Sequence, residues 1–218
     1  MLAFDLETTS ANPKEARIVT SALVRIDGRD VQKVEHLADP GIEIPEEATN
    51  VHGITTEKAR AEGRPHEEVL KDTVAAIKAA WEDGLTLIVY NAAFDLTVLR
   101  SLTGDFTVTG PVYDPYVIDR VSDKWRKGKR TLGAVCEHYG VSLEDAHTSA
   151  ADCLATERLG AAMARKFPQL AMPAGRLHEQ QVQWAKEQAA DLQAYFDRIG
   201  KKTTVNGEWP VRPGRAEQ

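Results

Sequence analysis

A short apolar segment near the middle of the chain, Leu85–Tyr90, constrains the fold more than any other feature. It is almost continuously apolar and rich in β-branched residues, which is typical of a strand buried on both faces. A helical apolar pattern precedes it over Glu67–Glu82, and a second predicted helix follows over Phe94–Leu102. A strand that is buried on both faces and lies between two helices predicts a sheet with helices packed against it.

The first forty residues predict a different arrangement, in which successive strands pair directly. Strands are expected over Leu2–Leu6, Ile18–Ile26 and Val31–Leu37, and the pair Asp27-Gly28 is typical of a hairpin turn. An antiparallel meander followed by alternating helices and strands predicts an α/β fold, with a mixed sheet flanked by helices.

The rest of the chain predicts further short elements and one long helix. The expected elements are a helix over Thr55–Ala61, a strand at Val112-Tyr113, a helix that Asp114 caps and Pro115 begins, and helices over Leu132–Tyr139 and Ser149–Lys166. The segment Met172–Gly175 has the composition of a boundary, and one apolar stripe then extends from Leu177 to Ile199. We therefore expect a main domain over residues 1–170 and a C-terminal helix with a polar tail over 171–218.

Charge and cysteine usage exclude several classes of protein. The formal net charge is −6 over 218 residues, so the chain is not a generally basic nucleic-acid coat. Its two cysteines, Cys136 and Cys153, form no C-x-x-C pair, which favours a reducing cytoplasm over a secreted scaffold. The chain begins without the pattern of a signal peptide, and Leu85–Tyr90 is its longest apolar run, too short for a membrane span. A cytoplasmic protein without a membrane partner is expected.

The segment Phe4-Asp5-Leu6-Glu7 places two acids two residues apart on a predicted strand. Alternate residues of a strand share one face, so the carboxylates of Asp5 and Glu7 point the same way. Such carboxylates repel each other unless a positive charge lies between them, and a hard divalent cation with oxygen ligands fits. The alternative is an ordinary solvated strand face.

Two further acids occur where predicted helices begin. Asp95 lies in the first turn after the buried strand, where ligand groups of such sheets gather and where the helix dipole also favours an acid. Asp152 follows His147 by five residues, and its spacing from Ser149 also fits a capping box. A histidine beside a metal-bound water is a natural general base near neutral pH.

Each of these elements alone is open to a structural reading, but their combination indicates a site for chemistry. Four carboxylates and one histidine are the groups that a two-metal phosphodiesterase requires, because one ion activates water and the other stabilises the leaving oxygen.

The three segments resemble the exonuclease motifs of the DEDDh family, whose best-known member is the epsilon proofreading subunit of bacterial DNA polymerase III. The matching segments are Phe4–Thr9, Tyr90–Asp95 and His147–Asp152, within a resemblance that covers roughly residues 1–167. The resemblance implies a ribonuclease H-like fold with a mixed five-stranded sheet. It also implies two magnesium or manganese ions and stepwise release of 5′-mononucleotides from a 3′ end. Because Thr148 stands where relatives of the other subfamily carry tyrosine, the chain resembles the histidine type.

The resemblance also implies roles for individual residues. Asp5, Glu7, Asp95 and Asp152 would be the four acids that hold the metal ions, and His147 would be the general base.

The resemblance also indicates residues that would contact the substrate. The segment Glu47–Thr55 resembles a loop that lies near the terminal nucleotide in relatives, which makes Glu47 and His52 candidates for substrate contact. Thr8, Asn91 and Phe94 are further candidates, although Phe94 also suits a core position and His52 a turn without a ligand.

A run of five cations in seven residues follows, namely Lys124, Arg126, Lys127, Lys129 and Arg130. It predicts either a phosphate-binding loop or a solvated charged loop, and its place between the second and third motifs favours DNA contact.

The main functional hypothesis is therefore a 3′-5′ exonuclease that acts on DNA, at single-stranded or frayed ends, in proofreading or repair. The alternatives are a 3′-5′ exoribonuclease, a catalytically inactive nucleic-acid-binding module, and a subunit that binds a replicative polymerase through the C-terminal helix. The intact set of acids argues against the inactive module. The region Leu177–Pro213 resembles that of exonucleases from actinobacteria and their phages and contains no evident polymerase tether, which favours a stand-alone enzyme.

Overall fold

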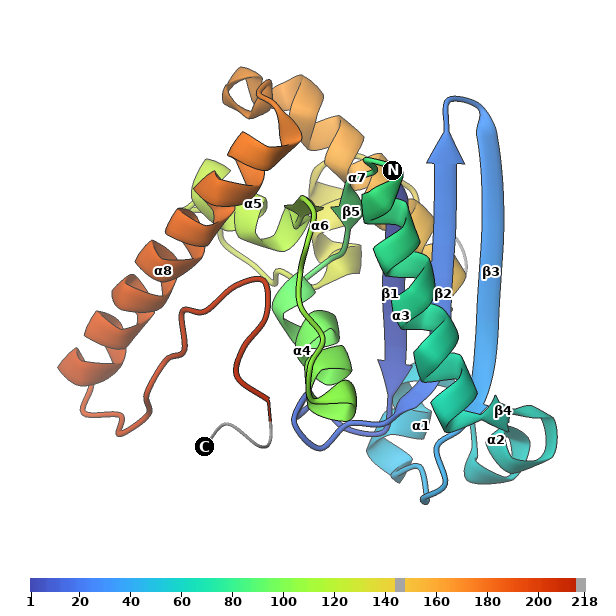
Figure 1. Cartoon of the computed structure of the whole chain (residues 1–218). Coiled ribbons are helices and arrows are strands. Elements are labelled where there is room, and N and C mark those ends of the chain that lie inside the picture. Colours follow the sequence, from blue (N-terminus) through green and yellow to red (C-terminus); the bar gives the residue numbers. More distant parts are fainter. Residues whose placement is uncertain (144–147, 215–218) are drawn as a thin grey trace.

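The computed structural model describes residues 1–143 and 148–214 and contains one mixed sheet with helices on both faces (Figure 1). The order of the strands across the sheet is β4-β3-β2-β1-β5-β6. Their bounds are β1 Leu2–Thr8, β2 Ile18–Asp27, β3 Asp30–Asp39, β4 Arg64–Pro65, β5 Leu87–Ile88 and β6 Val112–Tyr113. The predicted α/β class and mixed sheet are confirmed, but the described chain has six strands instead of five, because the two-residue β4 adds to the edge of β3.

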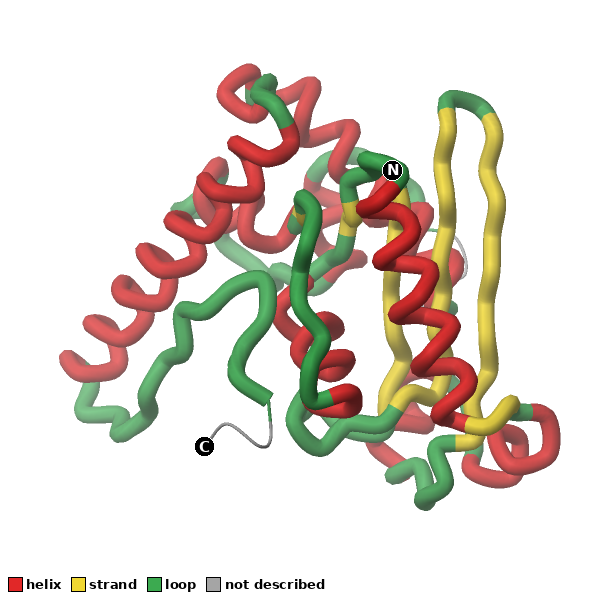
Figure 2. The backbone as a smooth tube through the Cα atoms, in the orientation of Figure 1, coloured by secondary structure: helices red, strands yellow, loops and turns green. Residues whose placement is uncertain are grey.

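The helices alternate with the later strands and cover the sheet (Figure 2). Their bounds are α1 Glu46–His52, α2 Thr56–Glu62, α3 His66–Glu82, α4 Ala92–Thr103, α5 Pro115–Ser122, α6 Leu132–His138, α7 Ser149–Lys166, the 3-10 turn Pro168–Leu170 and α8 Ala174–Arg198. The predicted helices are confirmed, with ends that differ by at most a few residues. The short helix α1 was not predicted, since its segment reads as a loop in the sequence.

The N-terminal meander forms as predicted. β1 and β2 pair antiparallel, as do β2 and β3, and Gly28 adopts a positive φ of 60° in the turn between β2 and β3. An Asp-Gly pair favours this hairpin because glycine reaches positive φ without steric cost. The opposite edge of β1 pairs with β5 in parallel, and β5 pairs with β6 in parallel.

The central strand is shorter than its apolar run. Only Leu87 and Ile88 pair as β5, although the apolar pattern predicted a strand over Leu85–Tyr90. The chain leaves the sheet after Val89, and Asn91 then takes a left-handed conformation (φ 59°, ψ 48°) immediately before α4. This early exit lets α4 begin beside the middle of β1, where the acidic residues lie.

The two faces of the sheet carry different layers. Helix α3 packs against β2 and β3 on one face, and α7 packs against β1 and β2 on the other. Phe4 and Leu6 of β1 point into the main apolar core, with Ile77 of α3 and Leu96 of α4. Because side chains alternate along a strand, the residues between them face α7.

The C-terminal helix α8 lies against the edge strand β6 and against α5. Its side chains satisfy the backbone of that edge. His178 Nδ1 accepts a hydrogen bond from the Val112 amide (3.1 Å), and the buried Gln181 donates to the Val112 carbonyl (2.9 Å) and accepts from the Asp114 amide (2.8 Å). The tail then returns to the body, where Trp209 joins the main core. The division at residue 170 stays a prediction, with these contacts joining its two sides.

Among the described residues, no helix has both the length and the apolar character that crossing a bilayer requires.

Candidate active site

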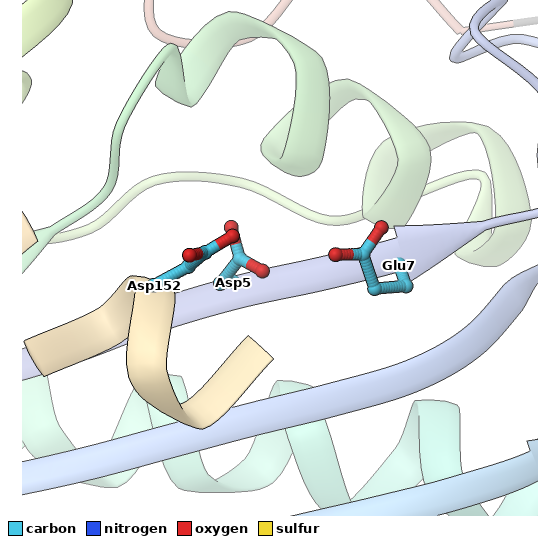
Figure 3. A group of neighbouring side chains, drawn as sticks. All are labelled: Asp5, Glu7 and Asp152. Carbon is cyan, nitrogen blue, oxygen red and sulfur yellow. The ribbon is translucent and has the colours of Figure 1, made fainter. Parts of the chain in front are cut away.

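Three acidic side chains meet where β1 faces the first turn of α7 (Figure 3). Asp5 and Glu7 project from β1 on the same side, and Asp152 approaches them from α7. One carboxylate oxygen of each lies within 4.8 Å of the others, and all three side chains are half-buried. The predicted clustering of Asp5, Glu7 and Asp152 is therefore present in the structure.

Asp95 lies beside this cluster and not within it. Its side chain is only 4% exposed, and its Oδ1 accepts a hydrogen bond from the Leu6 amide at 3.1 Å. The pairing of β1 with β5 ends at Ala3, so the Leu6 amide needs another acceptor, and Asp95 supplies it. This bond fixes Asp95 against the backbone between Asp5 and Glu7.

The pKa values of these acids reflect their burial and the short distances between their carboxylates. Burial raises the pKa of Asp5 well above its ordinary range, and the negative charges of Asp95, Glu7 and Asp152 raise it further. Burial and Asp152 raise the pKa of Glu7 from 4.5 to about 7. The pKa of Asp95 is also well raised, chiefly by burial, against the opposing hydrogen bond from Leu6. Like charges at such separations destabilise the fully ionised state unless a cation offsets them.

The start of α7 differs from the predicted capping box. The helix is preceded by Thr148, whose side chain makes no capping hydrogen bond, and Ser149 is already helical. The capping interpretation of Ser149 and Asp152 is therefore wrong. The buried Ser149 hydroxyl instead pairs with the Thr20 hydroxyl of β2, and its hydrogen bond to Asp5 lowers the pKa of that acid. Ser149 thus orients the acid site, a role that the sequence does not reveal. His147 lies outside the described residues.

An open cavity of about 400 Å³ lies directly beside Glu7. Its lining includes Glu7, His52, Lys58, Thr148 and Ser149. The His52 side chain is 9% exposed, and its Nδ1 accepts a hydrogen bond from the Ile54 amide at 3.1 Å. Burial lowers the pKa of His52, which favours the neutral ring, while the nearby Thr8 backbone opposes this shift. His52 and Glu7 thus line one cavity, and contact of His52 with substrate stays a prediction.

The other substrate-contact candidates have different surroundings. Thr8 is buried at the end of β1, and its hydroxyl donates to the Ser10 carbonyl at 3.0 Å. Phe94 is half-buried and packs against the main core. Asn91 lines a separate cavity between α4, α5 and α8. Glu47 is exposed on α1 and is not among the residues that line the cavity beside Glu7.

Asp114 supports the turn that leads into α4. As predicted, it precedes α5 and accepts from the Tyr116 amide at 2.9 Å. The same buried carboxylate also accepts from the amides of Asn91 (2.9 Å) and Ala92 (3.0 Å). Burial raises the pKa of Asp114 to about 6, against the opposing effect of these donors. The capping pattern alone predicted the first of these bonds, whereas the others depend on the sheet bringing two distant turns together.

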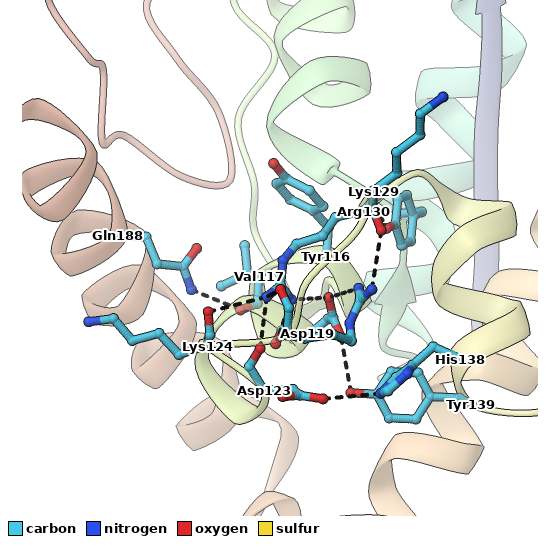
Figure 4. Close-up of polar contacts among 12 residues, drawn as sticks. Tyr116, Val117, Asp119, Asp123, Lys124, Lys129, Arg130, His138, Tyr139 and Gln188 are labelled. Atoms are coloured by element: carbon cyan, nitrogen blue, oxygen red, sulfur yellow. Dashed lines mark hydrogen bonds and ion pairs between the residues drawn. The ribbon is translucent and has the colours of Figure 1, made fainter. Parts of the chain in front are cut away.

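The cationic loop between α5 and α6 is largely tied to the protein (Figure 4). Asp119 is fully buried and binds the guanidinium groups of Arg126 (2.8 Å) and Arg130. The Tyr139 hydroxyl donates to the same carboxylate at 3.0 Å. Lys124 pairs with Asp191 of α8 at 2.6 Å. The expectation that the whole run contacts phosphate therefore does not hold for Arg126 and Arg130, which a buried anion holds in place.

Two lysines of the loop, Lys127 and Lys129, are exposed. Trp125 beside them has 85% of its surface exposed, and the ammonium of Lys124 lies 5.3 Å from its ring centre.

Comparison with sequence families gives a match to the Exonuclease family over residues 2–159. Among curated proteins, the chain is 32% identical over 169 residues to a DNA polymerase III subunit epsilon-like protein of Rhodobacter capsulatus, covering 71% of this chain and 22% of that protein. It is 30% identical over 162 residues to DNA polymerase III PolC-type of Clostridium perfringens, covering 72% of this chain and 11% of that protein. The chain thus spans a small part of these relatives.

Solved structures share the fold at lower identity. Exonuclease X in complex with 5′ overhanging duplex DNA aligns with a TM-score of 0.61 and 19% identity, covering 83% of this chain and 98% of that one. Escherichia coli Exonuclease I in complex with a dA16 oligonucleotide aligns with a TM-score of 0.64 and 20% identity, covering 78% of this chain and 41% of that one.

Proposed function

This chain belongs to the Exonuclease family, and on that premise we propose that it releases 5′-mononucleotides from the 3′ end of a nucleic acid strand, with DNA favoured over RNA. The observation that carries the proposal is the meeting of Asp5, Glu7 and Asp152 within 4.8 Å, with Asp95 fixed beside them. Three carboxylates this close together repel one another and destabilise the fold unless a cation lies among them.

We propose that these four acids hold two divalent cations, Mg²⁺ or Mn²⁺. The donor set fits, since every group is a carboxylate and hard divalent cations prefer oxygen ligands. Burial and the neighbouring carboxylates raise the pKa values of Asp5 and Glu7, and a bound cation would offset that repulsion. Bound cations would activate water and stabilise the charge that develops on the transferred phosphoryl group.

Other side chains would position the acids, line the nucleotide cavity and accept the proton of the attacking water. Asp95 and Ser149 fix the positions of the β1 acids, through the Leu6 amide and the Asp5 carboxylate. The cavity beside Glu7, with His52 in its wall, would receive the terminal nucleotide. We assign the general base to His147, whose imidazole would accept the proton of the attacking water, in line with its place five residues before Asp152.

The experiment that tests the proposal compares three substrates under identical conditions. Single-stranded DNA, duplex DNA and RNA of one sequence, each labelled at the 3′ end, are incubated with Mg²⁺ or with a chelator. Immediate release of labelled mononucleotide from DNA, and its loss with chelator or in Asp152→Asn, is expected. A parallel 5′-labelled strand should instead shorten stepwise. Release of the 5′ label first, or no release from any strand, would contradict the proposal, and faster release from RNA would assign an exoribonuclease.

Association with a replicative polymerase is a second proposal, favoured by the two polymerase III relatives. The matches span 11% and 22% of those proteins. Retention of a replicative polymerase by the full tagged chain, in a salt-resistant complex of fixed stoichiometry, would favour an associated proofreader. Its absence would favour a stand-alone repair enzyme.

A further inference from the structure

The last described segment, Trp209–Gly214, lies along α4, the helix that carries Asp95 (Figure 2). Trp209 is 7% exposed and belongs to the main core. The Arg212 amide donates to the Thr97 hydroxyl of α4 at 2.9 Å. Gly214 is buried near the backbone of Arg100, one turn further along α4. The segment therefore contacts α4 at two successive turns, at Thr97 and at Arg100.

Trp209 and the start of α4 share one acceptor atom. The Trp209 Nε1–H donates to Asp114 Oδ2 at 3.0 Å, and the Ala92 amide donates to the same oxygen at 3.0 Å. The other oxygen of Asp114 accepts from the Asn91 amide. Among the donors that lower the pKa of Asp114 against its burial, the Trp209 indole has the largest effect. The indole thus helps to keep this carboxylate ionised and fixed in orientation.

The turn that Asp114 holds determines where Asp95 lies. Asn91 adopts a left-handed conformation, which is unfavourable for most residues that carry a side chain. The first amides of a helix also lack intrahelical acceptors. Asp114 supplies acceptors for the Asn91 and Ala92 amides, and so it stabilises both the left-handed residue and the start of the helix. Asp95 follows within one helical turn, and its carboxylate reaches the Leu6 amide of β1. A loosened turn would therefore displace Asp95 relative to the β1 acids.

We infer that Trp209 is a positioning residue for the acid site, acting through Asp114 on the Asn91–Ala92 turn and so on Asp95. The inference rests on the proposed function, in which Asp95 is a metal ligand. The segment that supplies the indole lies outside residues 2–159, the part of the chain that matches the family. The C-terminal tail would thus complete a site whose acids all come from the matched part.

The test compares Trp209→Phe with Trp81→Phe in the full chain. Both replace a buried indole in the main core, since Trp81 is 8% exposed and its Nε1–H donates to the Pro111 carbonyl at 3.3 Å. Only the first change removes a donor to Asp114. Amide hydrogen exchange at Asn91 and Ala92 should become about tenfold faster in Trp209→Phe, as expected when one hydrogen bond to a charged group is lost. The same amides should be unaffected in Trp81→Phe.

Two functional readouts accompany the exchange measurement. Calorimetric titration with Mn²⁺ should show weaker binding by Trp209→Phe, and kcat on a short oligonucleotide should fall while KM changes less than about twofold, as expected when the reacting geometry is disturbed. Equal exchange at Asn91 and Ala92 in the two variants, with equal Mn²⁺ affinity, would overturn the inference. If the wild-type chain bound no Mn²⁺, the proposed function would fail, and faster exchange in Trp209→Phe would still establish the contact.

A tryptophan analogue tests the inference even if the phenylalanine variant misfolds. Replacing Trp209 with 3-benzothienylalanine retains the bicyclic ring and removes only the N–H donor. The same increase in exchange at Asn91 and Ala92 is expected, and wild-type exchange in this protein would overturn the inference.

Discussion

Removing the buried anion of the cationic loop should destabilise the whole protein. In Asp119→Ala, the guanidinium groups of Arg126 and Arg130 would lose their common partner, although their side chains are only 9% and 17% exposed. Breaking a buried ion pair by deleting one partner costs about 3–5 kcal/mol. For a chain of this size each kcal/mol lowers Tm by about 2–4 °C, so a fall of about 6–20 °C is expected. Urea unfolding followed by circular dichroism measures the change directly.

The matched control neutralises the exposed cations of the same loop. Lys127→Gln combined with Lys129→Gln should change the free energy of unfolding by less than about 0.5 kcal/mol per substitution. If these lysines contact the phosphates of a bound strand, the double variant should also reduce the salt dependence of single-strand binding by up to about two units of slope. The reasoning would be refuted if Asp119→Ala unfolded within 1 kcal/mol of wild type, because Arg126 would then not depend on this anion.

Three further predictions concern the acid site. Asp5→Asn should abolish nucleotide release yet raise the Tm of the metal-free protein, because it relieves repulsion; residual turnover near the wild-type rate would exclude Asp5 as a ligand. His147→Ala should lower kcat by about 10²–10⁴-fold and change the pH–rate profile, and an unaltered profile would show that another group is the base. The pKa of Glu7 is raised on folding, so the folded state binds the proton more tightly than the unfolded state. The stability of the metal-free protein should therefore fall as the pH rises from about 4.5 to about 7. Urea titrations of Glu7→Gln should show no such dependence of stability on pH.

The parts of the site that the sequence predicts are those fixed by local periodicity or by the spacing of the three motifs. Alternation along β1 places Asp5 and Glu7 on one face, and the helix that begins at Ser149 carries Asp152 toward them. The first inference needs only the strand repeat, whereas the meeting of Asp152 with the β1 acids followed from the resemblance to the exonuclease motifs. The contact between Ser149 and Thr20 joins residues 129 positions apart and depends on how α7 packs on β2, so no local pattern contains it.

The cationic loop shows a different limit of sequence interpretation. A run of lysines and arginines carries the same charge whether it faces a ligand or an internal anion. What separates the two cases is the burial of Asp119, a residue that looks like an ordinary exposed acid in the sequence of α5. Trp209 had a weak signal, as an isolated aromatic residue in a polar tail, but the identity of its partner depends on the return of the chain to α4.

The two borders of the sheet differ in what they offer to another polypeptide. Side chains of α8 occupy the backbone groups of β6, so this border cannot accept an added strand from a neighbouring chain. At the other border, β4 pairs with β3 only at Ala38 and Asp39, and within the described chain the rest of β3 has a free outer side. Val31 and Val34 there are 47% and 46% exposed. Self-association at high concentration would therefore begin at the β2–β3 hairpin.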